Sequence, residues 1–183
     1  DKTLIIYIRK TYKEKTMTTL NVKEIYHDLH QMPELGLEEY KTSAYLAEAM
    51  EKLGYEVTRN VGGTGVVAIE KGEEDGPVLL LRADMDALPF VVDGKPVNIH
   101  ACGHDAHSAM LLAAASVIKG KIKRGTLKIL FQPAEETLKG ALGVIEAGVL
   151  ALTNNCLYIF SLTFRLPYIV NELKRHHKIG WVY

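Results

Sequence analysis

The sequence predicts an α/β protein built around a largely parallel sheet. Apolar runs at Val78–Leu81 and Leu127–Phe131 are typical of strands that are buried on both faces. Segments with helical spacing of apolar residues lie between and around these runs, and most of them end at a glycine or a proline. Strands that alternate with helices indicate a layered domain in which helices cover a parallel sheet.

Two helices are expected in the first third of the chain. One covers Val22–Met32 and stops before Pro33, because proline disfavours helical geometry in the residue before it. The other covers about Glu38–Leu53 and ends at Gly54. Its apolar residues recur at every third position: Ala44, Ala47, Met50 and Leu53.

Three further elements complete the expected order. A strand at Val66–Glu70 follows the Gly62–Gly63 turn, and a helix runs from Ala106 to about Lys119 before Gly120. A short helix is expected within Leu138–Leu150 and ends at Gly148. The sequence shows no internal repeat.

The composition excludes several classes of protein. The chain has 183 residues, 48% hydrophobic and 24% charged, which suits a globular protein with one domain, or one domain and a fragment. Lys and Arg number 22, as do Asp and Glu, so no basic field favours nucleic acid. No apolar run reaches the roughly 18 residues of a membrane span. Cys102 and Cys156 make no disulfide framework, which predicts a reducing, cytoplasmic setting.

Polar side chains gather where the predicted strands end. Asp84 and Asp86 follow one apolar run, and Glu135 and Glu136 follow another. A loop and the first turn of the next helix carry a third set: Cys102, His104 and His107. Ligands of α/β sheets bind outside the carboxyl ends of the strands, so this convergence predicts a metal hydrolase site.

The residue types suit metal-assisted hydrolysis. Cys102 and His104 are two positions apart, so both can reach one ion, and they are good ligands for zinc and acceptable ones for manganese, cobalt or nickel. Adjacent glutamates point in different directions, so one can bind metal while the other serves as a base. Asp84 and Asp86 share a face of an extended segment and either bind metal or orient a ligating histidine.

Simpler interpretations stay open for each motif. The glutamate pair suits a solvated helix start, and Asp-x-Asp suits a turn or an N-cap. His107 lies where it could cap a helix, and His100 could be an ordinary loop residue. A different enzyme class would use Cys102 as a nucleophile with His104 or His107 as its base.

Three ordered segments carry a family resemblance: "RADMDALPF", "HACGHDAHSAMLLAAA" and "ILFQPAEE". They resemble the signature segments of the metallo-amidohydrolases, which include hippurate hydrolases, N-acyl-amino-acid hydrolases and N-acetyldiaminopimelate deacetylases. That family belongs to the dinuclear aminoacylase and carboxypeptidase group. The similarity covers residues 17–150 and implies the N-terminal part of a three-layer, zinc-peptidase-like catalytic domain.

The resemblance also implies roles for individual residues. Cys102, His104 and Glu136 would be metal ligands, and Glu135 would be the general base. Asp86 would be a carboxylate that holds a ligand in place. The family uses two divalent ions (Zn, Mn, Co or Ni) to activate water, and its substrates are small N-acyl amino acids or dipeptide-like molecules.

The chain departs from the family pattern at both ends. Residues 1–16 resemble no family segment, which suggests Met17 as the natural start, and an ordinary N-terminal strand is the alternative. In the divergent tail, residues 151–183, Ser161 and Thr163 stand where the family has a glycine and a histidine ligand. The basic stretch that contains His176 and His177 is expected to be solvated.

The family's lid or dimerisation domain, with its further ligands, has no counterpart in this sequence. We therefore expect a truncated copy that binds fewer ions. A metal-binding remnant without turnover is the alternative. Apolar surface left uncovered by the missing part favours homo-oligomers.

Overall fold

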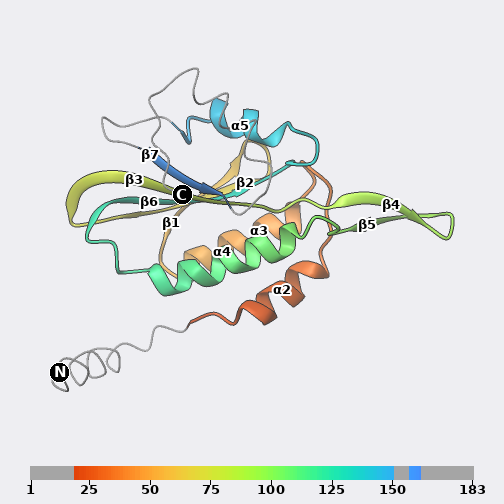
Figure 1. The fold of residues 1–183 in the computed structure, drawn as a ribbon, viewed down its shortest axis with the longest axis horizontal. Helices are drawn as coiled ribbons and strands as arrows, with labels where there is room; N and C mark the ends of the chain where they lie inside the picture. Colours follow the sequence, from red (N-terminus) through yellow and green to blue (C-terminus); the bar gives the residue numbers. More distant parts are fainter. Residues whose placement is uncertain (1–18, 151–156, 162–183) are drawn as a thin grey trace.

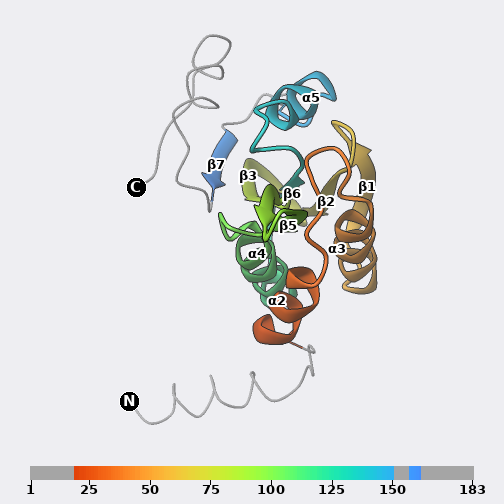
Figure 2. The ribbon, with the colours of Figure 1, turned by 90° about the vertical axis from the view of Figure 1, so that its right-hand side faces the viewer.

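A mixed five-stranded sheet lies between two layers of helices (Figure 1). The computed structural model describes residues 19–150 and the backbone of residues 157–161. Two helices cover one face of the sheet, α3 (Tyr40–Lys52) and α4 (His104–Ile118), and α2 (Val22–His30) packs on α4 from the side away from the sheet. The last described helix, α5 (Gly140–Glu146), lies on the other face, as Figure 2 shows from the side. The expected α/β class with three layers is confirmed.

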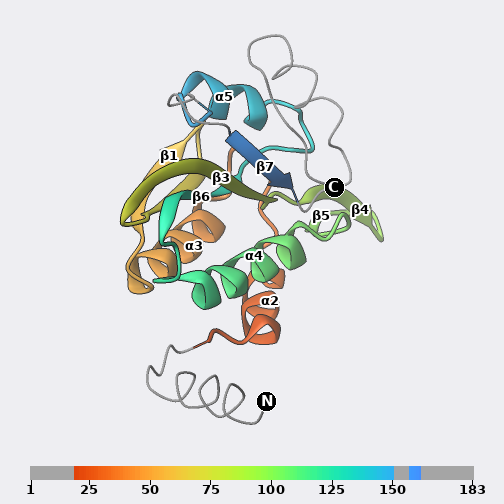
Figure 3. The ribbon, with the colours of Figure 1, turned by 60° about the vertical axis from the view of Figure 1, so that its left-hand side comes forward.

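The strands follow one another across the sheet in an order that differs from their order in the chain. That order is β1 (Glu56–Val61), β2 (Gly65–Lys71), β6 (Arg124–Gln132), β3 (Glu74–Asp84) and β7 (Leu157–Ser161). The neighbours β6, β3 and β7 are parallel, as expected, whereas β2 runs antiparallel to both β1 and β6. Figure 3 shows β7 beside β3 at one edge of the sheet.

A separate two-stranded hairpin extends from the body of the molecule (Figure 1). It consists of β4 (Leu88–Val92) and β5 (Lys95–Ile99). Its turn, Asp93–Gly94, has φ angles of 51° and 73°, which are the positive values that an Asp-Gly hairpin turn requires. The hairpin, β1 and β7 were not predicted, although the Asp-Gly pair was a usable hairpin signal.

The core forms on both faces of the sheet because strand side chains alternate. Ile129 and Phe131 of β6 are fully buried against the helical layer that contains Leu46 and Met50 of α3. Their neighbour Leu130 points to the opposite face. There it packs with Leu80 of β3 and Val144 of α5. Burial on both faces explains the apolar run of β6, whereas Leu79 in the run of β3 is 39% exposed.

Helix α4 is attached to the carboxyl end of β3. Ala109, Leu112 and Ala115 are buried in the core on the helical side of the sheet. Ser108 in the second turn donates a 2.7 Å hydrogen bond to the backbone oxygen of Asp84. The first turn of α4 is thereby placed next to the residues that follow β3.

The residues that the structure describes include no helix that is long and apolar enough to cross a bilayer. Four residues that the sequence analysis discusses lie outside the described residues: Cys156, Thr163, His176 and His177. The same holds for residues 1–16. The expectations for those positions stay predictions.

The turn after β6 approaches the start of α5 closely. Gly140 donates a 3.2 Å hydrogen bond from its backbone N–H to the oxygen of Ala134. A Cβ atom at Gly140 would collide with the backbone oxygen of Pro133. Only glycine fits here without a backbone shift, so the contact requires this residue.

We expect Gly140→Ala to lower the free energy of unfolding by about 1–3 kcal/mol, the usual cost of overpacking. Alanine is the better helix former, so propensity alone would predict the opposite sign. Urea unfolding followed by circular dichroism measures the change. Leu142→Ala is the control on the same helix, because Leu142 is 57% exposed. An unchanged midpoint for Gly140→Ala would contradict the close contact.

Candidate metal centre

The polar residues after β3 and β6 meet at one edge of the sheet. The two strands are parallel neighbours, and their register pairs Asp84 with Gln132. The segments that leave them therefore start side by side. Asp84 and Asp86 come from the first segment, and Glu135 and Glu136 come from the second. All four residues are buried or half-buried.

His104, the first residue of α4, lies at the middle of this group and is 2% exposed. Its Nδ1 is 3.0 Å from both the backbone oxygen and Oδ1 of Asp86. Both partners are acceptors, so Nδ1 carries the proton and donates it. Nε2 is then the nitrogen that is left to bind a metal. Three carboxylate oxygens surround it: Asp84 Oδ2 at 3.7 Å, Glu136 Oε1 at 3.8 Å and Glu135 Oε2 at 3.9 Å.

Two sets of potential ligand atoms share this histidine. One consists of Cys102, His104 and Glu136, and the other of Asp84, His104 and His107. Within each set the ligand atoms lie within 4.8 Å of one another. The first set is the one that the sequence singles out, and the structure brings its three members together. The second adds Asp84 and His107. Because one imidazole nitrogen has one lone pair, His104 can serve either set but not both at once.

The first set fits a divalent ion chemically. A thiolate, an imidazole and a carboxylate are the donors that zinc prefers in proteins. Glu136 Oε1 is buried and has no hydrogen-bond partner among the described residues, which is the state expected of a ligand atom. Cys102 is exposed, so an ion can reach the set from solvent. His107 Nδ1 of the second set is likewise buried without a hydrogen-bond partner in the described part of the chain.

The charges around His104 favour a cation. Burial alone would lower the pKa of His104, but its hydrogen bond to Asp86 and the charge of Asp84 raise the pKa overall. Burial raises the pKa of Glu135, and the charge of Asp84 raises it further. Both shifts reflect several carboxylates in a small buried volume.

Arg82 offsets part of this negative charge. It is 4% exposed, forms an ion pair with Asp84 and donates a 3.1 Å hydrogen bond from Nε to Gln132 Oε1. Sequence reasoning missed Arg82, although a charged residue at the end of the Val78–Leu81 run was a signal. A cation beside Asp84 weakens that carboxylate as a metal ligand. The pair therefore favours the first set over the second.

Asp86 connects two of the candidate ligands. Its Oδ1 receives the hydrogen bond from His104, and its Oδ2 accepts a 2.9 Å hydrogen bond from the backbone N–H of Glu136. One buried carboxylate thus orients the imidazole and fixes the backbone of the glutamate. This is a typical arrangement around metal-binding histidines.

The remaining histidines near the centre have other contacts. His30 Nδ1 lies 2.7 Å from Asp105 Oδ2, and its ring lies 6.4 Å from that of His100. His100 is buried, and burial lowers its pKa. Neither His30 nor His100 belongs to the two ligand sets. The structure places both beside the centre and outside it.

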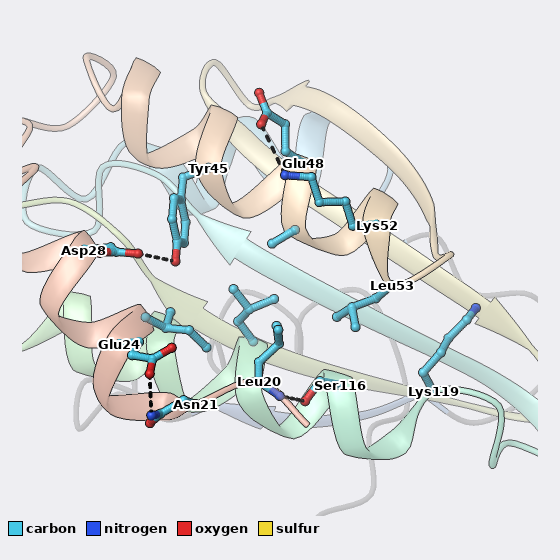
Figure 4. Close-up of a pocket in the computed structure, with 13 residues that line it drawn as sticks. Leu20, Asn21, Glu24, Asp28, Tyr45, Glu48, Lys52, Leu53, Ser116 and Lys119 are labelled. Atoms are coloured by element: carbon cyan, nitrogen blue, oxygen red, sulfur yellow. Dashed lines mark hydrogen bonds and ion pairs between the residues drawn. The ribbon is translucent and has the colours of Figure 1, made fainter. Parts of the chain in front are cut away.

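A cavity of about 600 Å³ lies elsewhere, between α2, α3 and the end of α4 (Figure 4). Leu20, Tyr45 and Ser116 are among the residues that line it. Ser116 is near the C-terminal end of α4, whereas His104 is at the N-terminal end. The cavity is therefore separate from the candidate metal centre.

Comparison with known families identifies the chain. Residues 80–174, more than half of the sequence, match the model of peptidase family M20/M25/M40. The chain belongs to this family. Hippurate hydrolase of Campylobacter jejuni is 42% identical over 134 residues, which is 69% of this chain and 35% of that protein. N-acetyl-L-cysteine deacetylase of Bacillus subtilis is 44% identical over 131 residues, covering 67% and 32%.

A solved structure of the M20 family agrees with the fold. The YXEP protein of Bacillus subtilis, a dinuclear metal-binding peptidase, superposes with a TM-score of 0.68 at 38% identity. The match covers 76% of this chain and 41% of that one. The resemblance to metallo-amidohydrolases is confirmed. The chain spans about a third of the length of the two curated M20 relatives.

We expect Asp86→Asn to disturb the centre even without metal. The amide has one oxygen where the carboxylate has two, so its NH₂ group must face either His104 Nδ1–H or the N–H of Glu136. An unsatisfied buried donor costs about 1–3 kcal/mol, which predicts a loss of that size in the free energy of unfolding. Denaturant unfolding of the metal-free chain measures it. Asp93→Asn at the exposed hairpin turn is the control, and an equal effect of both variants would refute the bridging role.

Proposed function

We propose that this chain is the N-terminal part of the catalytic domain of a metal-dependent amide hydrolase, with residues 17–150 as the family segment. The observation that carries the proposal is the convergence of Cys102, His104 and Glu136 on one point, with Asp86 behind the imidazole. The M20 relatives support it, because both curated relatives are amide hydrolases by name.

The three converging residues would hold one divalent ion: zinc, manganese, cobalt or nickel. A bound ion of this kind activates water and polarises an amide carbonyl. Asp86 keeps the proton of His104 on Nδ1, so that Nε2 faces the ion. Three protein ligands leave room for water and a substrate oxygen.

Glu135 would be the general base. Its Oε2 lies 3.9 Å from His104 Nε2, on the ligand side of the imidazole. From there it can accept the proton of the attacking water and pass it to the leaving nitrogen. The amide C–N bond breaks, and the products are a carboxylic acid and an amine.

The substrate class follows from the relatives by analogy. Hippurate hydrolase and N-acetyl-L-cysteine deacetylase are named for N-acyl amino acids. We therefore propose a small N-acyl amino acid or a dipeptide-like substrate for this site, in a cytoplasmic setting. The chain spans only the first part of such enzymes. We propose residues 151–183 as a divergent tail, of which the family model matches the part up to residue 174.

A second candidate is a metal-binding remnant of the fold without turnover. The observation that favours it is the number of ligands, because each set in the described residues has three members. The resemblance implies that the family uses more ligands, for two ions. A remnant would bind one ion and leave amides intact.

Metal titration tests the ligand assignment. We expect Cys102→Ala and Glu136→Gln each to weaken Zn²⁺ binding more than about 100-fold, since loss of outer-shell partners alone costs 10–100-fold. His107→Ala should leave the affinity within about threefold, because it would hold no ligand position. Competition with a chelating dye measures all three. Strong weakening by His107→Ala, with little effect of Cys102→Ala, would assign the ion to the second set.

Hydrolysis of hippurate and N-acetyl amino acids tests the activity itself. We expect turnover that is lost on chelation, restored by metal and reduced about 10²–10⁴-fold by Glu135→Gln. Bound metal without any hydrolysis would support the remnant. Activity that survives chelation and disappears with Cys102→Ala would replace the metal mechanism with a thiol nucleophile.

A further inference from the structure

Two buried carboxylates hold the turn that carries Glu135 and Glu136. The N–H of Glu136 donates to Asp86, as described above, and the N–H of Ala134 donates a 2.8 Å hydrogen bond to Glu39 Oε1. Glu39 lies 95 positions earlier in the chain. The residues next to Glu39 in the sequence give no reason for this contact. The roles assigned to the residues of the candidate centre do not account for it either.

Glu39 is fully buried, with an exposed fraction of 0%. Its second oxygen, Oε2, accepts a 2.5 Å hydrogen bond from the hydroxyl of Thr64, in the turn between β1 and β2. Burial raises the pKa of Glu39, which shows that the position disfavours a charge. A buried carboxylate is costly unless its hydrogen bonds are satisfied, and here each oxygen has a donor.

Glu39 occupies the N-cap position of α3 but makes no capping hydrogen bond to that helix. Side chains at this position normally accept a hydrogen bond from the first turn of their own helix. The side chain of Glu39 instead reaches another part of the structure. Helix capping is therefore not its role.

The turn that Glu39 contacts has strained geometry. Ala134 has a φ of 49°, in the left-handed region that residues with a Cβ avoid. Such a conformation persists when several surrounding contacts fix it. Gly140 N–H binds the oxygen of Ala134, as noted above. A Cβ at Gly36 would lie only 2.9 Å from Ala134 Cα, so the loop before α3 packs closely against the same residue.

That loop also touches the segment of Asp86. Ala87 donates a 2.7 Å hydrogen bond from its N–H to the oxygen of Glu34. Leu35 pairs with Ala87 in an isolated parallel bridge. The loop between α2 and α3 therefore contacts both segments that supply the candidate ligand groups, and Glu39 is its buried polar contact with the turn.

We propose that Glu39 is a positioning residue that holds Ala134 in its left-handed conformation, so that Glu135 and Glu136 face His104. Glu39 belongs to neither ligand set, and it acts through the backbone of the turn. The role in metal binding rests on the proposed function, whereas the role in fixing the turn does not. Thr64 assists by satisfying the second oxygen.

Amide hydrogen exchange in the metal-free full chain tests the turn directly. We expect Glu39→Ala to reduce protection of the Glu136 amide at least about tenfold, although the partner of that amide is Asp86. Core amides of β6 should keep their protection, whereas a merely structural role would reduce protection throughout the domain. Glu39→Gln retains an acceptor for Ala134 and should restore most of the protection. Exposed Glu38→Gln is the matched control.

Cobalt substitution tests the consequence for the centre. We expect Glu39→Ala to weaken Co²⁺ binding by about 10–100-fold and to change the visible spectrum of the bound ion, with Glu39→Gln close to the unaltered chain. An unaltered chain that binds no Co²⁺ would refute the proposed function, and hydrogen exchange alone would then decide the role of Glu39. Unchanged Glu136 protection in Glu39→Ala would overturn the proposal.

Discussion

The parallel pairing of β3 with β6 is the constraint on which the candidate centre depends. Its register sets Asp84 beside Gln132, and the residues that follow each strand emerge at the same edge. The apolar residues of both strands fix this register, because Leu80 and Leu130 pack on one face while Ile129 and Phe131 pack on the other. A shift of one residue would turn each set to the wrong face. The position of the polar residues is therefore a consequence of how the apolar ones are buried.

The elements that the sequence predicts well are those whose pattern follows from burial. β6 is apolar because both of its faces are covered, and β3 is covered on both faces except at Leu79, which is 39% exposed. Helices α2, α3 and α4 show helical spacing because one side of each faces the core. β1 lacks such a pattern, since most of its side chains are exposed at the edge of the sheet. The sequence did not predict the direction of β2 relative to its neighbours either. An apolar strand has the same sequence pattern whether its neighbours run parallel or antiparallel to it.

The same distinction applies to the site. Cys102, His104 and the glutamate pair carry local signals, because their spacing and their place after strands can be read from short segments. The contacts that orient them join distant residues: Asp86 binds the backbone of Glu136 across 50 positions, and Glu39 binds Ala134 across 95. Arg82 and Glu39 have ordinary neighbours in the sequence. Their roles become visible only when the fold brings their partners to them.

These hydrogen bonds bear on the order of folding and metal binding. In small zinc domains the ion is needed for folding, because no preformed site exists without it. Here Asp86 orients His104 and the turn of Glu136 through bonds that need no ion, and the core on both faces of the sheet is independent of the centre. The described part of the chain therefore holds its candidate ligands in place through hydrogen bonds that need no ion. The carboxylates around His104 repel one another, so an ion that binds the folded chain relieves this repulsion and adds stability in proportion to its differential affinity for the folded state.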